Sequence, residues 1–299
     1  MAIRIGNAPV SWGIMEVEGW NGQQAYGDML DELVKAGYAG TELGPYGYFP
    51  TEPEALCHAL ATRKLALVTA FVPIALADAA THEAGFAEAL KTAQLLAAAG
   101  ARSLVLADAM SKERMAIAGR ADAARDGLSD AQWEHAAAIV TRVAKACREL
   151  GLAVSFHHHA GTYIETPAEI ARLLASTDAE LLGLCLDTGH YFYGGGDPLE
   201  AVHQYGARIR HLHLKDVQSP VLDAVRRDGV DFLEAVRRGV FCELGQGAIP
   251  FPQIIEGLQA SGYDGWAIVE QDTDVSQPGV DPMASAQRSR QYLREVIGL

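Results

Sequence analysis

Histidines and carboxylates stand at the ends of several short apolar runs in this 299-residue chain. One run alternates polar residues with leucines, at His211, His213 and Lys215. Two other runs end in a carboxylate, at Asp187 and at Glu270. Carboxylates and imidazoles are the side chains that bind divalent metals and transfer protons near neutral pH. Their shared position at the ends of apolar runs predicts that these runs deliver them to one site.

The spacing of His211, His213 and Lys215 predicts a strand that carries all three side chains on one face. Successive side chains of a strand point to opposite sides, so residues two apart share a side. An outward row of polar groups against apolar helices would leave those groups unpaired. The row is therefore expected to face the interior of the sheet.

Further candidates follow two other runs, where His157 and His159 end one run and Glu42 ends the other. A single carboxylate at a strand end is often a helix N-cap, and a single inward histidine is often a core residue. Several such groups together are better explained by a divalent cation that neutralises the carboxylates. Oxygen and nitrogen donors suit Mn²⁺, Co²⁺, Mg²⁺, Fe²⁺ or Zn²⁺, and we expect Mn²⁺ or Co²⁺ first.

The elements that must position these groups alternate regularly along the chain. Apolar, β-branched runs predict strands, and the alanine-rich amphipathic stretches between them predict helices. The predicted strands are 3–8, 40–43, 66–71, 103–107, 153–157, 182–187, 209–214 and 266–270. The predicted helices are 23–36, 53–63, 82–99, 130–150, 167–175, 198–205, 252–260 and 284–296. Eight strand–helix units close a (β/α)₈ TIM barrel, an α/β fold whose chemistry lies at the carboxyl ends of the strands.

An open doubly wound sheet is disfavoured, because no glycine-rich nucleotide turn follows Ala8. Residues 1–299 are predicted to form a single domain. Two segments are longer than ordinary connections, 108–129 and 215–247, and we expect both to lie over the active face. The second contains a helical pattern of its own, at 219–238.

Composition narrows the class of partner. A net charge of −14 repels nucleic acid and anionic membranes. No stretch approaches the length of apolar residues that a membrane span needs. The four cysteines are scattered without a metal-binding spacing, which is typical of free thiols in a reducing compartment. We therefore expect a cytoplasmic enzyme that acts on a small molecule, and the sequence leaves homo-oligomer formation open.

At these residues the chain resembles the xylose-isomerase-like barrel superfamily of sugar isomerases and epimerases. The likeness rests on the strings 184–190, 211–216 and 269–271 and extends over essentially the whole chain. Within the superfamily, the loop strings 7–13, 42–48, 157–166 and 239–247 resemble the inosose dehydratases of myo-inositol catabolism.

One departure from the superfamily concerns the end of the fifth predicted strand. The superfamily places a glutamate there, two residues before a histidine, whereas this chain has His157 and keeps the later histidine at His159. Either His157 binds the metal through nitrogen, or Glu165 folds back to supply the carboxylate. Hard divalent ions prefer oxygen donors, which favours Glu165 slightly. Glu165 also fits a structural role, as an acid near the start of the helix at 167.

The resemblance implies a metal-dependent hydro-lyase that removes water from 2-keto-myo-inositol (scyllo-inosose) to give a trihydroxycyclohexane-dione. The implied metal ligands are Asp187, His213, Glu270 and either Glu165 or His157. The acid–base candidates are Lys215, whose pKa we expect burial beside a metal to lower, and His190. Lys215 could instead pair with Asp216 or Glu243, and His190 could be an ordinary loop residue. The expected substrate contacts are Asn7, Glu42, His159 and His211. Trp12, Tyr46 and Tyr48 are expected to form an aromatic wall against the substrate ring, or alternatively to pack at the rim of the barrel without contacting substrate.

Three other functions compete with this one. A ketose isomerase or epimerase would use the same metal and the same enediolate chemistry, so the motifs alone do not exclude it. A nuclease on this barrel would need a basic groove, which the net charge disfavours. A catalytically silent barrel is disfavoured, because it would keep several carboxylates together in its interior without the cation that stabilises them.

Overall fold

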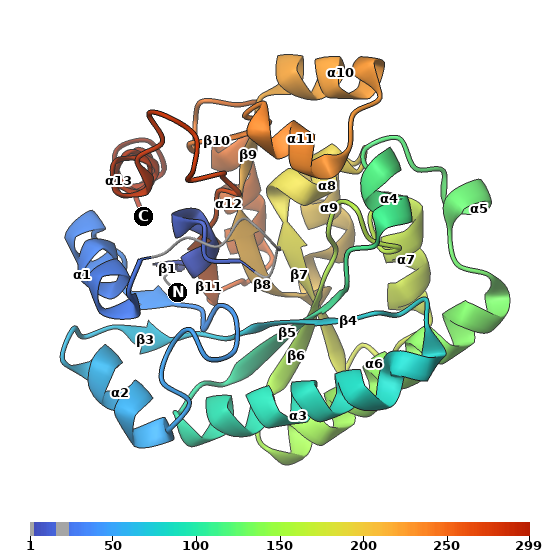
Figure 1. Cartoon of the computed structure of the whole chain (residues 1–299), viewed down its shortest axis with the longest axis horizontal. Helices are drawn as coiled ribbons and strands as arrows, with labels where there is room; N and C mark the ends of the chain where they lie inside the picture. Colours follow the sequence, from blue (N-terminus) through green and yellow to red (C-terminus); the bar gives the residue numbers. More distant parts are fainter. Residues whose placement is uncertain (1–2, 16–23) are drawn as a thin grey trace.

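A ring of parallel strands forms the centre of the computed structural model, which describes residues 3–15 and 24–299 (Figure 1). The strands of the main sheet are β1 Arg4–Asn7, β2 Gly40–Thr41, β3 Ala66–Leu67, β4 Phe71–Ile74, β5 Ser103–Asp108, β6 Ala153–His157, β7 Leu182–Asp187, β8 Ile209–Leu214 and β11 Trp266–Val269. Their order is β3-β2-β1-β11-β8-β7-β6-β5-β4. The predicted strands are therefore all present, with shifts at their ends.

The third predicted strand closes the barrel in two pieces, β3 and β4. These are the two ends of the strand order, yet they belong to one short segment of chain. Between them, the Leu43 amide donates to the carbonyl of Thr69 (2.9 Å), and the Val105 amide donates to the carbonyl of Ala70 (3.0 Å). The segment thus bridges its two neighbours, and the chain is a single-domain TIM barrel.

Helices cover the outside of this ring, as the amphipathic stretches predict. They are α1 Tyr26–Ala36, α2 Pro53–Ala61, α3 His82–Ala98, α6 Asp130–Glu149, α7 Pro167–Ala175, α9 Pro198–Tyr205, α12 Phe251–Ala260 and α13 Pro282–Tyr292. The starts of α6 and α7 are fixed by capping boxes, from Ser129 with Gln132 and from Thr166 with Glu169. These local signals explain why those boundaries could be placed from the sequence.

The register of the strands decides which side chains enter the barrel. Paired residues of neighbouring parallel strands project to the same side of the sheet. Ile268 pairs with His213, and His213 is aligned with Asp187, so these three side chains face the interior. Asn7 pairs with Val269, one residue out of phase, and both therefore face the helices. The predicted inward row at 211, 213 and 215 is confirmed by the complete burial of these side chains against other polar groups.

The two long segments form additional helices at one end of the barrel (Figure 1). Segment 108–129 contains α4 Lys112–Ile117 and α5 Ala123–Asp126, and segment 215–247 contains α10 Ser219–Asp228 and α11 Phe232–Arg237. The expected helix at 219–238 is interrupted at Gly229, whose φ of 67° ends α10. A short antiparallel ladder of β9 Asp216–Val217 and β10 Phe241–Cys242 closes the base of the second segment.

These helices surround an apolar core that is separate from the main one. Its buried members include Leu222, Val225, Phe232, Val236 and Phe241. The short helix α8, Thr188–Tyr193, adds Tyr193 to the same core. The helices α4 and α11 also contact each other, so the two long segments support one another above the strand ends.

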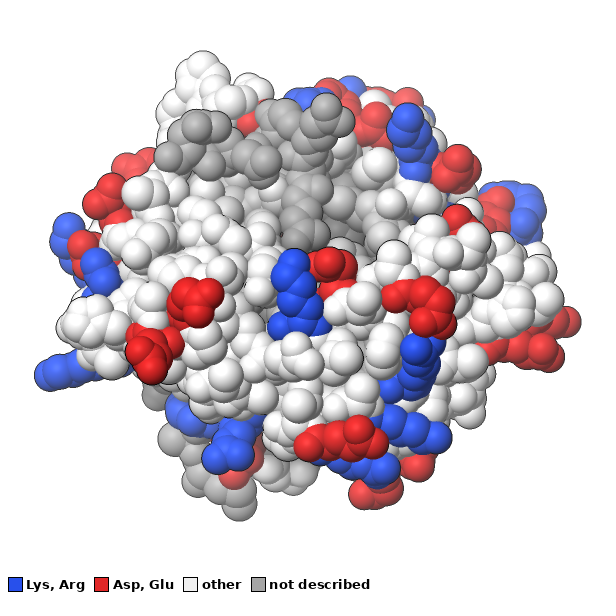
Figure 2. All heavy atoms as spheres, turned by 60° about the horizontal axis from the view of Figure 1, so that its bottom comes forward, with Lys and Arg blue, Asp and Glu red and all other residues white. Residues whose placement is uncertain are grey.

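The surface agrees with the charge expected from the composition. Within the two described ranges, no helix is long and apolar enough to cross a membrane. On the face drawn in Figure 2, acidic and basic side chains alternate, and the coloured residues form no continuous basic area. This face therefore offers no groove suited to a phosphate backbone.

Candidate active site

A cavity of about 550 Å³ opens at the carboxyl ends of the strands. We call its ionisable side the floor. Glu42, Asp108, His157, His159, Lys215, Glu270 and Asp272 line the cavity there, and the floor also includes three buried side chains that contact them, Asp187, His211 and His213. We call the apolar part that the two long segments supply the wall, which consists of Met110, Met115, Phe232, Leu233 and Val236. The cavity thus combines charged groups with an apolar surface that excludes water.

Four side chains from consecutive strands converge at this floor. The donor atoms of His157, Asp187, His213 and Glu270 all lie within 4.8 Å of one another. His157 Nε2 is 3.5 Å from Asp187 Oδ2, and His213 Nδ1 is 3.3 Å from Glu270 Oε2. Each of these side chains is at most 9% exposed. The set has the nitrogen and oxygen donors that a divalent ion prefers.

Several of these donor atoms have no partner within the described protein. Both ring nitrogens of His157, Nδ1 of His213 and Oδ2 of Asp187 are buried without a hydrogen bond. A buried polar atom without a partner is costly, and a buried carboxylate more so. Burial also lowers the pKa of His157, which keeps its ring neutral and its lone pair available. The residues present therefore fit a divalent cation.

Asp187 combines the two roles that a strand-end carboxylate can have. Its Oδ1 accepts a hydrogen bond of 2.7 Å from the backbone N–H of His190 and so caps α8. Its Oδ2 remains free and faces the cluster. The capping role therefore does not compete with metal binding, because the two oxygens point to different partners.

Glu42 orients the histidines of β8. Its Oε1 lies 2.9 Å from Nε2 of both His211 and His213. A carboxylate accepts hydrogen bonds, so Nε2 of His213 carries a proton toward Glu42. This leaves Nδ1 of His213 as the atom directed at Asp187 and Glu270. A carboxylate behind a ligating histidine is a common way to fix its tautomer and ring orientation.

Lys215 lies among three buried carboxylates. Its Nζ donates to Asp272 Oδ1 (2.9 Å) and lies 3.2 Å from Glu270 Oε2 and 3.5 Å from Asp187 Oδ2. Burial by itself lowers the pKa of Lys215, but the charges of Asp187, Asp272 and Glu270 together raise it above its ordinary value. Without a bound ion, burial therefore acts more weakly on this pKa than the three carboxylates, and the expected lowering beside a bound metal stays a prediction.

The two alternative partners of Lys215 are occupied elsewhere. Asp216 points away from the interior, and its carboxylate accepts backbone N–H groups at 217, 245, 247 and 249. Glu243 forms an ion pair with Arg288. Lys215 thus belongs to the site, and Asp216 holds the base of segment 215–247.

Two histidines flank Lys215 in different ways. His190 Nε2 lies 3.0 Å from Lys215 Nζ, but His190 is fully buried and is not among the residues that line the cavity. His159 does line the cavity, and its Nδ1 donates to the carbonyl of Ala160 (2.7 Å). Nε2 of His159 therefore carries a lone pair, and burial lowers the pKa of this ring to about 4. His159 can act as a neutral base, whereas His190 can act only through Lys215.

The structure places Glu165 outside the cluster. Its two oxygens accept the backbone N–H groups of Gly119 (2.6 Å) and Gly161 (2.7 Å). Burial raises the pKa of Glu165 to about 7. Glu165 therefore joins segment 108–129 to the loop after β6, while His157 stands in the position at the end of β6.

The expected aromatic wall is not part of the cavity surface that the described residues form. Trp12 is buried in the main core and donates its Nε1 to Glu32 (2.7 Å). Tyr46 lies beneath Lys91, whose Nζ is 4.0 Å from the ring centroid. Tyr48 donates its hydroxyl to a backbone carbonyl. These three residues therefore show the alternative role, rim and core packing.

Asn7 also lies apart from the cavity. Its Oδ1 accepts the backbone N–H of Ala8 (2.8 Å), and the register of β1 turns the side chain toward the helices. The expected contact between Asn7 and substrate does not agree with this orientation. The physical reason is strand parity, which the sequence run at 3–8 did not resolve because each face of this strand carries one polar residue, Arg4 on one and Asn7 on the other.

Sequence reasoning missed two floor residues, Asp108 and Asp272. Asp272 follows Glu270 by two residues, so the parity argument used for β8 would have found it. Asp108 ends β5, and its two oxygens accept N–H groups from Leu76 (2.9 Å) and Tyr163 (2.7 Å). Burial raises its pKa to about 7. No motif marked it, because its partners are backbone groups distant in sequence.

Comparisons with known proteins identify the family of this chain. A family model described as xylose isomerase-like TIM barrel matches residues 30–296. An inosose dehydratase from Lacticaseibacillus casei is 34% identical, with 100% of this chain and 99% of that protein aligned. An inosose dehydratase from Geobacillus kaustophilus is 36% identical, over 98% and 94% of the two chains.

Among solved structures, the IOLI protein with a bound zinc atom superposes with a TM-score of 0.72 at 14% identity, covering 99% of this chain and 98% of that one. At that identity the likeness concerns the fold. The family match and the two dehydratases confirm the superfamily expected from the sequence. The chain belongs to the xylose isomerase-like TIM barrel family.

Proposed function

We propose that this protein is a metal-dependent hydro-lyase that converts 2-keto-myo-inositol to a trihydroxycyclohexane-dione. The proposal is supported by relatives named inosose dehydratase that align along their whole length. The observation that carries it is the group of unpaired buried donors beside Lys215 on the floor of the cavity. A protonated amine next to a metal site can supply the proton that a departing hydroxyl group takes up.

His157, Asp187, His213 and Glu270 would hold the ion, with Glu42 behind His213. A divalent ion bound there would polarise the substrate ketone and stabilise the negative charge that develops on its oxygen. Two carboxylates and two imidazoles suit Mn²⁺ or Co²⁺ best, by the preferences of these donors. Glu165 is left out of the proposed set because its oxygens are taken by backbone N–H groups.

The protein's own groups supply the proton transfers. His159 offers a free lone pair at Nε2 on the cavity surface and would remove the proton next to the ketone. Lys215 is held as an ammonium by its three carboxylates and would donate a proton to the departing hydroxyl. The C–H proton passes to His159, and the hydroxyl leaves as water with the proton of Lys215. Asp272 positions Lys215 by accepting a hydrogen bond from its Nζ, and His190 Nε2 lies beside both groups.

The wall would select the substrate by contact with the C–H face of its ring. Met115 and Phe232 present apolar surface to the same cavity as the charged floor. A ring whose hydroxyls point outward along its edge can place those hydroxyls on the floor and one apolar face on the wall. Water is displaced in this arrangement, which strengthens the electrostatic interactions of the floor.

The test is a product assay on protein stripped of metal and then supplied with Mn²⁺ or Co²⁺ and 2-keto-myo-inositol. We expect metal-dependent ultraviolet absorbance of the conjugated dione and a loss of one water by mass. A metal-dependent product of unchanged mass, from this or another ketose, would assign the protein to the isomerases and epimerases instead. Turnover that survives complete metal removal would contradict the proposed metal centre.

A further inference from the structure

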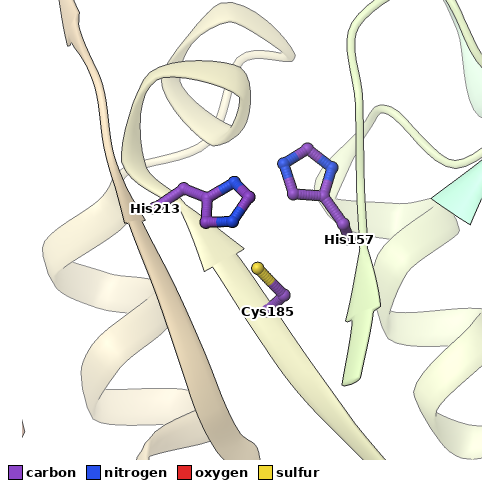
Figure 3. A group of neighbouring side chains, drawn as sticks. All are labelled: His157, Cys185 and His213. Atoms are coloured by element: carbon purple, nitrogen blue, oxygen red, sulfur yellow. The ribbon is translucent and has the colours of Figure 1, made fainter. Parts of the chain in front are cut away.

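Cys185 lies directly below the proposed metal ligands. It is two residues before Asp187 on β7, so both side chains face the interior, and Cys185 is completely buried. In Figure 3 the rings of His157 and His213 face each other, and the sulfur of Cys185 lies beneath them. The ring centroids of the two histidines are 4.9 Å apart. The three side chains come from β6, β7 and β8.

The backbone register arranges the donors in two levels. His157 is paired with Cys185, whereas His213 is aligned with Asp187 one level nearer the cavity. The donor atoms of His157, Cys185 and His213 all lie within 4.8 Å of one another. The rings of His157 and His213 are therefore within reach of oxygen donors above them and of a sulfur donor below them.

The free nitrogens of His157 are a second, independent sign of a ligand at this level. Both are buried without a partner, although a histidine needs only one nitrogen to bind an ion above it. His157 is 1% exposed, and its donor nitrogens lie within 4.8 Å of donor atoms of both Cys185 and Asp187. One ring can thus serve either level after a small rotation of its side chain.

We propose that His157, Cys185 and His213 form an inner metal position that takes thiophilic divalent ions, such as Cd²⁺ or Zn²⁺. This inference rests on the proposed metal centre, because the two positions share both histidines. Soft and borderline ions favour thiolate with imidazole, whereas Mn²⁺ and Mg²⁺ favour carboxylate. On binding, the thiol of Cys185 releases its proton to solvent and the sulfur bonds to the ion.

Occupation of the inner position would inhibit the enzyme. The shared histidines allow only one of the two positions to be filled at a time. Cys185 lies two residues below Asp187 on β7, level with His211 rather than His213, so an ion bonded to it lies farther from the strand ends than an ion held by Asp187. Such an ion would lie farther from a substrate that rests on Lys215 and Glu270. Thiophilic ions should therefore displace Mn²⁺ without supporting turnover.

The experiment adds Cd²⁺ to metal-free protein and follows the ultraviolet charge-transfer absorbance of a cadmium–thiolate bond. The variants are Cys185→Ser and Cys185→Ala, and the matched control is Cys57→Ser, which removes a partly exposed thiol away from the site. We expect the band in wild type and Cys57→Ser and its loss in both Cys185 variants. Equilibrium dialysis should show Cd²⁺ bound at least about tenfold more weakly by the Cys185 variants, as expected for loss of a ligand.

The outcomes separate this inference from the proposed function. Cadmium that binds stoichiometrically without a thiolate band would overturn the inner position and leave the outer centre intact. A band of equal strength in Cys185→Ala would also overturn it, by assigning the bond to another thiol. Protein that binds neither Cd²⁺ nor Mn²⁺ would overturn both proposals. Because the wild-type band is measured directly, the first result stands even if one Cys185 variant fails to fold.

Discussion

The floor of the cavity comes from the ends of barrel strands, whereas the wall comes from the two long connecting segments. Floor side chains are fixed by each other, as when Glu42 contacts both His211 and His213. Wall side chains are apolar and are fixed by the packing of α4 against α11. The floor therefore determines the chemistry and tolerates few substitutions. Substitutions in the wall can alter which substrate binds without disturbing the barrel.

The segments that carry the wall are joined to each other by hydrogen bonds. Arg120 donates to the carbonyl of Val230 (3.0 Å), and Arg226 donates to the carbonyl of Gly119 (3.0 Å). Glu165 joins the same segment to the barrel through Gly119. The two segments thus hold each other as one unit, and the apolar wall side chains make no part of these polar attachments, which makes floor and wall separable by mutation.

The largest expected effect comes from Asp187→Asn on the floor. Asparagine keeps an oxygen that can cap α8 but removes the charge that faces the cluster. Metal affinity should fall by at least about 100-fold. Activity should fall by at least about 10⁴-fold, because the transition-state stabilisation of a bound ion is lost.

The matched control for this variant is Asp197→Asn, which alters an exposed carboxylate that caps α9 in the same way. Its metal affinity and turnover should equal those of wild type. Metal content is measured after dialysis, and turnover by dione absorbance. Full metal binding by Asp187→Asn would remove this residue from the ligand set and reduce it to a cap.

Lys215→Met should have the next largest effect. Methionine fills similar space but cannot donate a proton, so dehydration should slow by about 10²–10³-fold. Exchange of the substrate C–H in deuterated water should continue, because His159 is the proposed base. The control is Lys91→Met, a change at a surface lysine that covers Tyr46. Loss of exchange together with dehydration would instead make Lys215 the base.

Glu165→Gln tests whether Glu165 belongs to the floor or only supports the wall. The amide can accept one of the two backbone hydrogen bonds but not both, so the free energy of unfolding should fall by about 1–3 kcal/mol. Metal affinity should stay within about twofold of wild type, because His157 supplies the ligand at this position. Exposed Glu134→Gln is the control for stability. Metal loss as severe as that of Asp187→Asn would return Glu165 to the ligand set.

The same variant has an expected pH dependence. Burial raises the pKa of Glu165 from its ordinary value of 4.5 to about 7. Between these values the folded protein holds a proton that the unfolded chain has released, so the contribution of this carboxyl to stability falls as the pH rises. Glutamine does not titrate. The stability deficit of Glu165→Gln, measured by urea unfolding with a chelator present, should therefore shrink from pH 5 to pH 8.

The same division between floor and wall governs what the sequence could predict. Strand parity and hydrophobic period placed His213, Lys215 and Asp187, because β-strands repeat every two residues and the barrel fixes their register. Glu165 could not be assigned, because its orientation depends on the backbone of Gly119 in a distant segment. The two segments that carry the wall were predicted to lie over the active face, but the lining side chains were not, since methionine and phenylalanine in a loop look the same whether they line a cavity or a core.

The smallest expected effect is on the wall, with Met115→Ala. Met115 lines the cavity from α4 and has no polar role there. Removing part of its apolar surface should cost about 1 kcal/mol of substrate contact, which corresponds to about a fivefold rise in KM. Turnover at saturation should change little, because the floor is untouched. The control is Met283→Ala, which shortens a partly buried methionine that packs on the main core instead. A kcat that falls while KM stays constant would show that the wall holds the substrate in its reactive position, and that floor and wall are not separable after all.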